Sequence, residues 1–327
     1  VEVTTTGNAV VTNANTAAGY VATATASTLT VTGGTTAGTL TTTGAGLLTQ
    51  TLNSTGAANT VGAITNAATA TSMTINSTTN LTTGAITSAA LATLTITGAG
   101  DTDLNAAALP ATVGTVNASA ATGDVDVTMG AYTTDDSGAI DLVDISITSG
   151  SGDDLIDATN LDTSEEVSIN AGAGNDVVSI AFTPVNAAAA TAGDTIAGGY
   201  GTDTLTIDVD FIDTAAVTAA LTGVSGFETL NLSGAMGGGD VVTLANISSE
   251  LNRVNISSVT AGAGLTLNVG TSSTVGLNVA AAITAGGLLT IDSGTGTSDT
   301  TSIVNMLTAG QMASATSDIT VTDVETV

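Results

Sequence analysis

Apolar residues and threonines alternate in short runs along this chain of 327 residues. Clear examples are Leu29–Gly33 (LTVTG), Met73–Asn76 (MTIN) and Leu94–Gly98 (LTITG). Alternation with a period of two predicts β-strands that turn one face toward a core and the other toward solvent. The threonines of the outer face can then form ladders from one strand to the next.

The runs recur at a nearly constant spacing. Successive runs begin at Leu29, Leu52, Met73, Leu94 and Val116, at intervals of 23, 21, 21 and 22 residues. A repeat of this length indicates stacked coils, and parallel crossovers are overwhelmingly right-handed. The sequence therefore predicts an all-β fold, a right-handed parallel β-solenoid of the β-helix or β-roll kind, with about 22 residues per coil and short helical inserts. One such insert is expected at 213–223.

Acidic residues greatly outnumber basic residues in this chain. It has 29 acidic residues, one basic residue (Arg253) and no histidine, for a formal net charge of −28. Nucleic acids and anionic membrane surfaces need Lys and Arg side chains to neutralise phosphates, so neither is expected as a partner. The absence of cysteine excludes disulfides and thiolate metal sites. Because repulsion among so many negative charges opposes a compact state, bound cations are expected to neutralise part of the charge.

The acidic residues are concentrated in the middle of the chain. Twenty of the 29 lie within 101–213, and only one lies in the first hundred residues. We therefore divide the chain into uncharged Thr/Ala/Gly-rich coils at 1–100, acidic coils at 101–213 and C-terminal coils at 214–327. The chain ends inside a strand-like run, and we expect it to be a segment of a longer protein.

Three copies of a Gly–Asp pattern lie in the acidic range, at 150–157 (GSGDDLID), 172–179 (GAGNDVVS) and 198–206 (GGYGTDTLT). The third fits the nonapeptide of calcium-binding β-rolls in full, and the others lack only its first Gly. Glycine turns can point several carbonyls at a cation, because glycine tolerates positive φ, and Ca²⁺ takes about six to eight oxygens. The predicted calcium ligands are the carboxylates of these turns and the backbone at their glycines, namely Asp154, Asp176, Asp203, Gly150, Gly152, Gly172, Gly174, Gly199 and Gly201.

Acidic residues near these turns are further candidate ligands. Asp194 lies nine residues before Asp203, and that interval is the period of the nonapeptide. For the other acidic residues a solvated acidic surface is an equally good interpretation. These other residues are Asp101, Asp103, Asp135, Asp136, Asp153 and Asp157.

Two segments carry a resemblance to a known family. GGYGTDTLTIDVD (198–210) and SGFETLNLSGA (225–235) resemble the calcium-binding RTX segments of bacterial surface-layer (S-layer) proteins, and are most similar to the Caulobacter-type S-layer proteins. The resemblance implies an extracellular protein exported by type I secretion, which forms a lattice on the outer membrane with calcium inside the solenoid and at subunit contacts. By residue match, Asp154, Asp176 and Asp203 take the Asp position of the RTX pattern. The chain departs from the family in having no long nonapeptide tract.

We therefore expect a structural cell-surface protein that forms a calcium-dependent S-layer lattice or a filament outside the cell. The alternative is a secreted RTX adhesin, an extracellular β-solenoid binding module, although the sequence offers no aromatic or basic recognition surface. No enzyme is expected, because the chain has no His, Lys, Cys or HExxH motif. The expected partners are further copies of the chain, divalent cations, and outer-membrane polysaccharide contacted through regions outside these residues; neither nucleic acid nor direct membrane insertion is expected.

Overall fold

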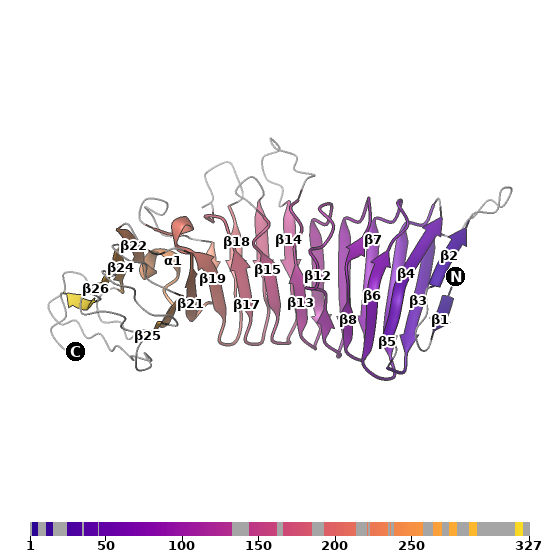
Figure 1. The fold of residues 1–327 in the computed structure, drawn as a ribbon, viewed down its shortest axis with the longest axis horizontal. Helices are drawn as coiled ribbons and strands as arrows, with labels where there is room; N and C mark the ends of the chain where they lie inside the picture. The colour runs from indigo at the N-terminus through magenta and orange to yellow at the C-terminus, as the bar shows by residue number, and fades with distance from the viewer. Residues whose placement is uncertain are drawn as a thin grey trace. The chain divides into compact units, whose positions relative to one another are not determined.

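The computed structural model (Figure 1) describes most of the chain. Two compact units divide it, Val1–Val178 and Ser179–Val327. The boundary lies inside the acidic range 101–213, so it does not coincide with the changes in composition. The described residues are 2–5, 11–15, 25–34, 36–44, 46–132, 144–161, 166–184, 193–213, 221, 223–234, 236, 239–257, 264–269, 275–279, 288–292 and 318–322.

Two parallel sheets build the first unit, and the chain alternates between them (Figure 1). The first sheet contains, in hydrogen-bonded order, β1 (Glu2–Thr5), β3 (Ala26–Thr32), β5 (Thr49–Thr55), β7 (Ser72–Ser77), β10 (Thr93–Gly98), β12 (Thr115–Ala121), β14 (Ile145–Thr148) and β16 (Val167–Asn170). The second contains β2 (Val11–Asn15), β4 (Thr36–Gly44), β6 (Asn59–Thr65), β8 (Leu81–Thr83), β11 (Thr102–Asp103), β13 (Val125–Thr128), β15 (Leu155–Ala158) and β17 (Val177–Ile180), with β9 (Ile86–Thr87) also paired to β6.

Each coil thus contributes one strand to each sheet, and the coils stack at about 23 residues per turn. The strand pairs described in this unit are parallel, for example β3 with β5 and β5 with β7. Neighbouring coils are therefore joined by backbone hydrogen bonds along both sheets. This architecture confirms the predicted all-β parallel β-solenoid.

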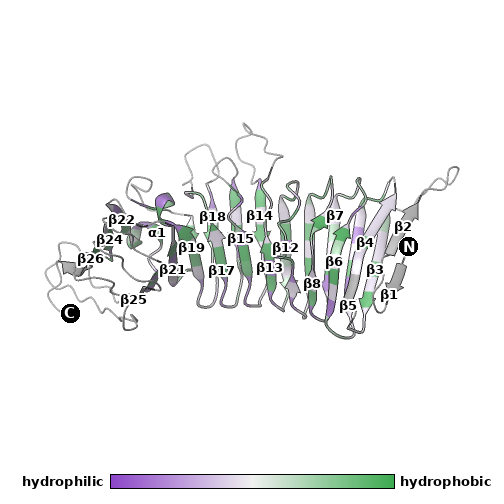
Figure 2. Ribbon diagram, in the orientation of Figure 1, coloured by the Kyte–Doolittle hydropathy of each residue, from purple (hydrophilic) through white to green (hydrophobic). Residues whose placement is uncertain are grey.

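The core is a thin column of aliphatic side chains between the two sheets. On β3 the buried and part-exposed residues alternate, and Leu29 and Val31 are 2% and 0% exposed. Figure 2 shows the same alternation as green and pale residues along the strands of the first unit. Burial of each such side chain stabilises the fold by about 1.5–3 kcal/mol. Because a coil encloses so little space, branched aliphatic residues fill it and large aromatic residues are rarely needed.

The strand register corrects one detail of the predicted spacing. The sequence pattern matched Leu52 with Met73 as first apolar residues, but Leu52 pairs with Ile75, and Met73 pairs with Gln50. Gln50 is 2% exposed and faces the core, as does Ser27, its partner on the preceding coil. The first inward position of these two coils is therefore polar, and a search for the first apolar residue misses it.

The second unit continues with parallel pairs. In one sheet β18 (Thr195–Ala197) pairs with β20 (Val224–Ser225), and a second sheet orders β19 (Thr204–Asp208), β21 (Thr229–Ser233), β23 (Arg253–Ile256) and β25 (Gly276–Val279). A third sheet orders β22 (Asp240–Thr243), β24 (Gly264–Asn268), β26 (Leu288–Asp292) and β27 (Asp318–Thr322). The described helices are a 3₁₀ turn η1 (Val209–Phe211) and α1 (Leu244–Ile247).

The helical insert expected at 213–223 lies almost wholly outside the described residues. Within the described part of the chain, none of the helices has the length and the apolar character that crossing a membrane requires.

Candidate functional site

Glycines stack where the first sheet turns into the second, over four consecutive coils of the first unit. Gly100, Gly123, Gly152 and Gly174 occupy equivalent positions in these turns. A Cβ atom on Gly152 would lie 2.5 Å from the carbonyl carbon of Gly123, and one on Gly174 would lie 2.0 Å from the carbonyl oxygen of Gly152. Only glycine allows the backbones of successive coils to approach so closely.

Two of the three Gly–Asp turns share one backbone conformation. In the second copy φ is 103° at Gly172 and 142° at Gly174, and in the third it is 109° at Gly199 and 147° at Gly201. These angles lie in the region that L-residues with a Cβ avoid. The first copy differs, because close contact alone requires its glycines: a Cβ on Gly150 would lie 2.1 Å from the carbonyl oxygen of Ala121.

The pattern aspartates of the first two turns are buried, and they form an inner column. Asp154 is 1% exposed and Asp176 is 0% exposed. Oδ1 of Asp154 accepts a hydrogen bond from the backbone N–H of Val125 at 2.7 Å, and Oδ1 of Asp176 accepts one from the N–H of Asp154 at 2.8 Å. Each buried carboxylate therefore caps a backbone donor of the preceding coil.

The carboxylate of Asp154 is also bonded within its own turn. Its Oδ2 accepts from the hydroxyl of Ser149 at 2.5 Å and from the N–H of Gly150 at 3.3 Å. Burial raises the pKa of Asp154 to about 6, although the hydrogen bonds from Ser149, Val125 and Gly150 act in the opposite direction; the nearby charge of Asp124 adds to the rise. Both oxygens of Asp154 thus serve as acceptors for protein donors.

The third turn, in the second unit, folds its aspartate back over its own first glycine. Asp203 is 0% exposed, and a Cβ on Gly198 would lie 2.6 Å from the Cβ of Asp203. The backbone N–H of Asp203 donates to Oε2 of Glu228 at 2.8 Å, and that of Gly226 donates to Oε2 of Glu250 at 2.6 Å. Sequence reasoning missed both glutamates as caps; the only available signal was their separation of 25 and 24 residues from the donors, one coil each.

Asp194 is buried as well, at 4% exposed. It directly precedes β18, whereas Asp203 follows the turn at the other end of that strand. The nine-residue interval therefore spans β18, and the two aspartates belong to different ends of one coil.

A second, outward column runs beside the buried one. Each member donates its backbone N–H to the side chain of the member on the preceding coil: Asp101 donates to Oδ1 of Asn80 at 3.2 Å, and Asp124 donates to Oδ1 of Asp101 at 3.2 Å. The column continues from Asp153 to Asp124 at 2.8 Å and from Asn175 to Asp153 at 2.7 Å. Asp101 therefore matches Asp153 rather than the pattern residue Asp154, and it belongs to the solvent-facing column.

The other candidates are scattered along the second sheet. Asp103 pairs in register with Asp126, whose pKa is raised by burial first and then by the charges of Asp103, Asp124 and Asp101. Asp157 lies on β15 and accepts hydrogen bonds from the N–H and hydroxyl of Thr159, at 3.0 and 2.6 Å. Asp135 and Asp136 lie outside the described residues.

The buried aspartates of the three turns differ in how well they fit a calcium ion. Within the described ranges, no three acidic side chains come close enough together to hold an ion by themselves. An ion here would need one carboxylate and several backbone or hydroxyl oxygens, which is a donor set that Ca²⁺ accepts. Oδ2 of Asp176 and Oδ2 of Asp203 are buried and receive no hydrogen bond, so these two atoms fit a cation. The oxygens of Asp154 already accept hydrogen bonds from Val125, Ser149 and Gly150, which leaves fewer lone pairs for an ion.

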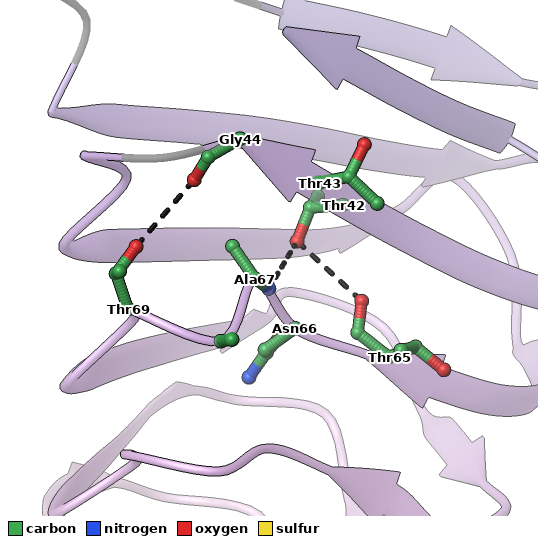
Figure 3. Close-up of a pocket in the computed structure, with 8 residues that line it drawn as sticks. Thr42, Thr43, Gly44, Thr65, Asn66, Ala67 and Thr69 are labelled. Atoms are coloured by element: carbon green, nitrogen blue, oxygen red, sulfur yellow. Dashed lines mark hydrogen bonds between the residues drawn. The ribbon is translucent and has the colours of Figure 1, made fainter. Parts of the chain in front are cut away.

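A separate groove of about 370 Å³ opens at the ends of β4 and β6 (Figure 3). The hydroxyl of Thr42 accepts from the N–H of Ala67 at 3.2 Å and donates to Oε1 of the buried Gln50. Oδ1 of Asn66, a residue only 5% exposed, receives no hydrogen bond. The groove is lined by uncharged residues, namely Thr42, Thr43, Gly44, Thr65, Asn66, Ala67, Ala68 and Thr69, so it provides no general acid or base.

Neither a protein-family model, nor a curated protein sequence, nor a solved structure matches the chain. The fold and the site therefore define the class on their own: a parallel β-solenoid whose Gly–Asp turns stack a buried column of carboxylates beside an exposed one.

Proposed function

We propose that the chain is part of a structural cell-surface protein that assembles outside the cell into a calcium-dependent lattice or filament of the S-layer kind. A repeated coil with a mainly aliphatic core supports a scaffold role, because the same unit recurs from coil to coil. The acidic groups described above face solvent, are buried at the turns, or cap backbone donors. They do not form a nucleophile–base pair of the kind that catalysis requires.

The observation that carries the proposal is the burial of like charges without basic residues to offset them. Asp154 and Asp176 are both essentially inaccessible, and they lie on adjacent coils, about 4.8 Å apart in strand spacing. A buried carboxylate needs a countercharge or a proton. The whole chain holds one basic side chain against 29 acidic ones, so a divalent cation is the natural countercharge.

The residues assigned to the ion follow from the geometry of the turns. Asp176 and Asp203 would each provide a carboxylate oxygen, and the carbonyls of the glycine turns would provide the neutral oxygens. Asp154 would instead hold the turn in shape through Val125, Ser149 and Gly150. Because a site built from folded turns does not exist in the unfolded chain, calcium binding would add directly to the stability of the fold.

The same chemistry supports an extracellular location. Sites with one carboxylate per ion bind calcium weakly, and extracellular modules work at about 10⁻⁴–10⁻³ M. A chain that is poorly folded where calcium is scarce and well folded where it is abundant would assemble only after export.

A secreted adhesin is the second candidate, and the groove at Asn66 favours it. Its threonine hydroxyls suit a neutral, hydroxyl-bearing ligand. An adhesin of this kind would bind its ligand as a monomer, whereas a lattice protein would form an ordered array.

Chelation is expected to abolish assembly. With 5–10 mM calcium, roughly ten times the range of extracellular sites, purified protein should form sheets or filaments in negative-stain electron micrographs, and excess EGTA should return it to single molecules. Magnesium at the same concentration should not substitute, because it requires a near-octahedral site and keeps its water ligands. Arrays that persist in EGTA would contradict the metal-dependent part of the proposal. Single molecules under all conditions would contradict the lattice.

A further inference from the structure

Over seven strands, the outward side of the first sheet has no charged strand residue; the carboxylates of Asp144 and Glu166 directly precede β14 and β16. From β3 to β16 every outward-facing strand residue is Ala, Gly, Ser, Thr or Asn. The strand register brings these residues into straight columns across the coils. One column consists of Thr28, Thr51, Thr74 and Thr95, which pair in register from strand to strand. We call this side, from β3 to β16, the neutral face.

A second column on the neutral face is tied together by side-chain hydrogen bonds. Asn53 donates through Nδ2 to Oγ1 of Thr30 at 3.4 Å, and Asn76 donates through Nδ2 to Oδ1 of Asn53 at 3.5 Å. The hydroxyl of Thr97 then donates to Oδ1 of Asn76 at 3.4 Å. Because the groups of this column already bond one another along the sheet, removing water from the column would break few hydrogen bonds.

Electrostatics select this face for contact between copies of the chain. Two copies each carry a formal net charge of −28 and repel one another wherever their acidic surfaces meet. Packed sheets lie about 10 Å apart, which is close to the Debye length at physiological ionic strength, so charges on facing sheets would be poorly screened. An uncharged sheet side avoids this repulsion.

The neutral faces of two copies also have the same spacing of side chains. Its columns repeat with the strand spacing of about 4.8 Å, and a second copy presents the same repeat over the same length. Stacked identical side chains with Asn ladders are the surfaces that form dry, interdigitated contacts between sheets. Seven strands about 4.8 Å apart and roughly 20 Å long would bury roughly 1,300 Å² in total over two copies, which is within the range of stable interfaces.

We propose that the neutral face is a self-association surface, which packs against the neutral face of a second copy of this chain. The inference rests on the proposed assembly function and adds the surface through which copies meet. Calcium at the Gly–Asp turns and the neutral face then have separate roles: the ion stabilises the coil, and the threonine columns join coils of different molecules.

Charge placed on the face should block the contact. In the full chain with calcium, Thr51→Glu combined with Thr74→Glu is expected to weaken self-association at least tenfold in sedimentation velocity, because four like charges would face one another across the interface. The matched control is Thr60→Glu with Thr82→Glu, an exposed and equally adjacent pair on the second sheet, which should associate as the unmodified chain does. Far-UV circular dichroism should be the same for both. Equal weakening by the two pairs would overturn the proposal.

Cross-linking supplies a test that does not depend on a charged variant folding. The chain has no cysteine, so Thr74→Cys introduces a single thiol on the neutral face and Thr82→Cys a single thiol on the second sheet. A short thiol-specific linker should join Thr74→Cys copies into covalent dimers and leave Thr82→Cys copies monomeric. An assembled but uncross-linked Thr74→Cys protein would refute this surface while leaving the proposed function intact. That result is expected if the face binds a crystalline polysaccharide or ice instead.

Discussion

Replacing Gly174 with alanine is expected to destabilise the solenoid by about 3 kcal/mol or more. Gly174 has φ of 142°, and a Cβ on it would lie 2.0 Å from the carbonyl oxygen of Gly152 on the preceding coil. The clash involves backbone on both sides, so no side chain can move to relieve it. The stack of coils would have to separate locally, which breaks the hydrogen bonds of the Asp176 turn as well. Urea denaturation followed by circular dichroism measures the loss.

The matched control for that variant is Gly276→Ala. Gly276 lies on a strand, and a Cβ there would meet nothing closer than 3.7 Å, the carbonyl oxygen of Asn252. Alanine in place of glycine in a strand costs nothing sterically here and reduces the freedom of the unfolded chain, so stability should stay level or rise by about 0.5–1 kcal/mol. If Gly174→Ala and Gly276→Ala unfolded at the same urea concentration, the close stacking of the glycine turns would be wrong.

In the presence of EGTA, the protein is expected to be more stable at pH 5 than at pH 7. Burial holds the pKa of Asp154 at about 6 in the folded state, above the ordinary value of about 3.9 in the unfolded chain. Between these two values the folded state binds more protons, so stability rises as pH falls. Asp154 alone should contribute about 1 kcal/mol between pH 7 and pH 5, and the raised pKa of Asp126 acts in the same direction.

Denaturation midpoints in urea at the two pH values measure this effect. Asp154→Asn keeps a carbonyl oxygen for the Val125 N–H and removes the charge, so most of the pH dependence should disappear in that variant. A protein that loses stability on acidification from pH 7 to pH 5 would show that Asp154 is better stabilised as a carboxylate than its burial implies.

The fold was predictable because it depends on a single repeated requirement. Most coils place apolar side chains inward and hydrogen-bond to the coil on either side, so alternation and a nearly constant interval recur along much of the chain. The interval is wider between Val116 and its partner Ile147. The exact register was less accessible. Gln50 faces the core at the position where the next coil has Met73, and only the paired backbone shows that the two are equivalent.

The sequence predicted which aspartates lie at the turns, but not what each carboxylate contacts. The Gly–Asp spacing located Asp154, Asp176 and Asp203, and all three prove to be buried at stacked turns. Adjacent residues in a turn point in opposite directions, however, so Asp153 and Asp154 belong to different columns. The caps Glu228 and Glu250 act on a coil 25 and 24 residues away, and their side chains could be assigned only from coordinates.

The two columns have different chemical consequences for assembly. The carboxylates of the inner column hold the turns in shape and place negative charge in the core. Their burial is therefore favourable only when a proton or a cation neutralises that charge. The outer column, from Asn80 to Asn175, faces water and can be screened by salt. Raising the ionic strength should therefore weaken the repulsion among the outer carboxylates. The buried carboxylates should need a proton or a cation as before.

A calorimetric titration with calcium tests the central claim most directly. The unmodified chain should take up calcium with a measurable heat, and Asp176→Asn combined with Asp203→Asn should lower the affinity at least tenfold or remove the transition, because each change neutralises a buried oxygen that receives no hydrogen bond. Asp101→Asn combined with Asp157→Asn, the matched outward pair, should titrate like the unmodified chain. A chain that takes up no calcium, or a buried-pair variant that titrates identically to it, would contradict the account.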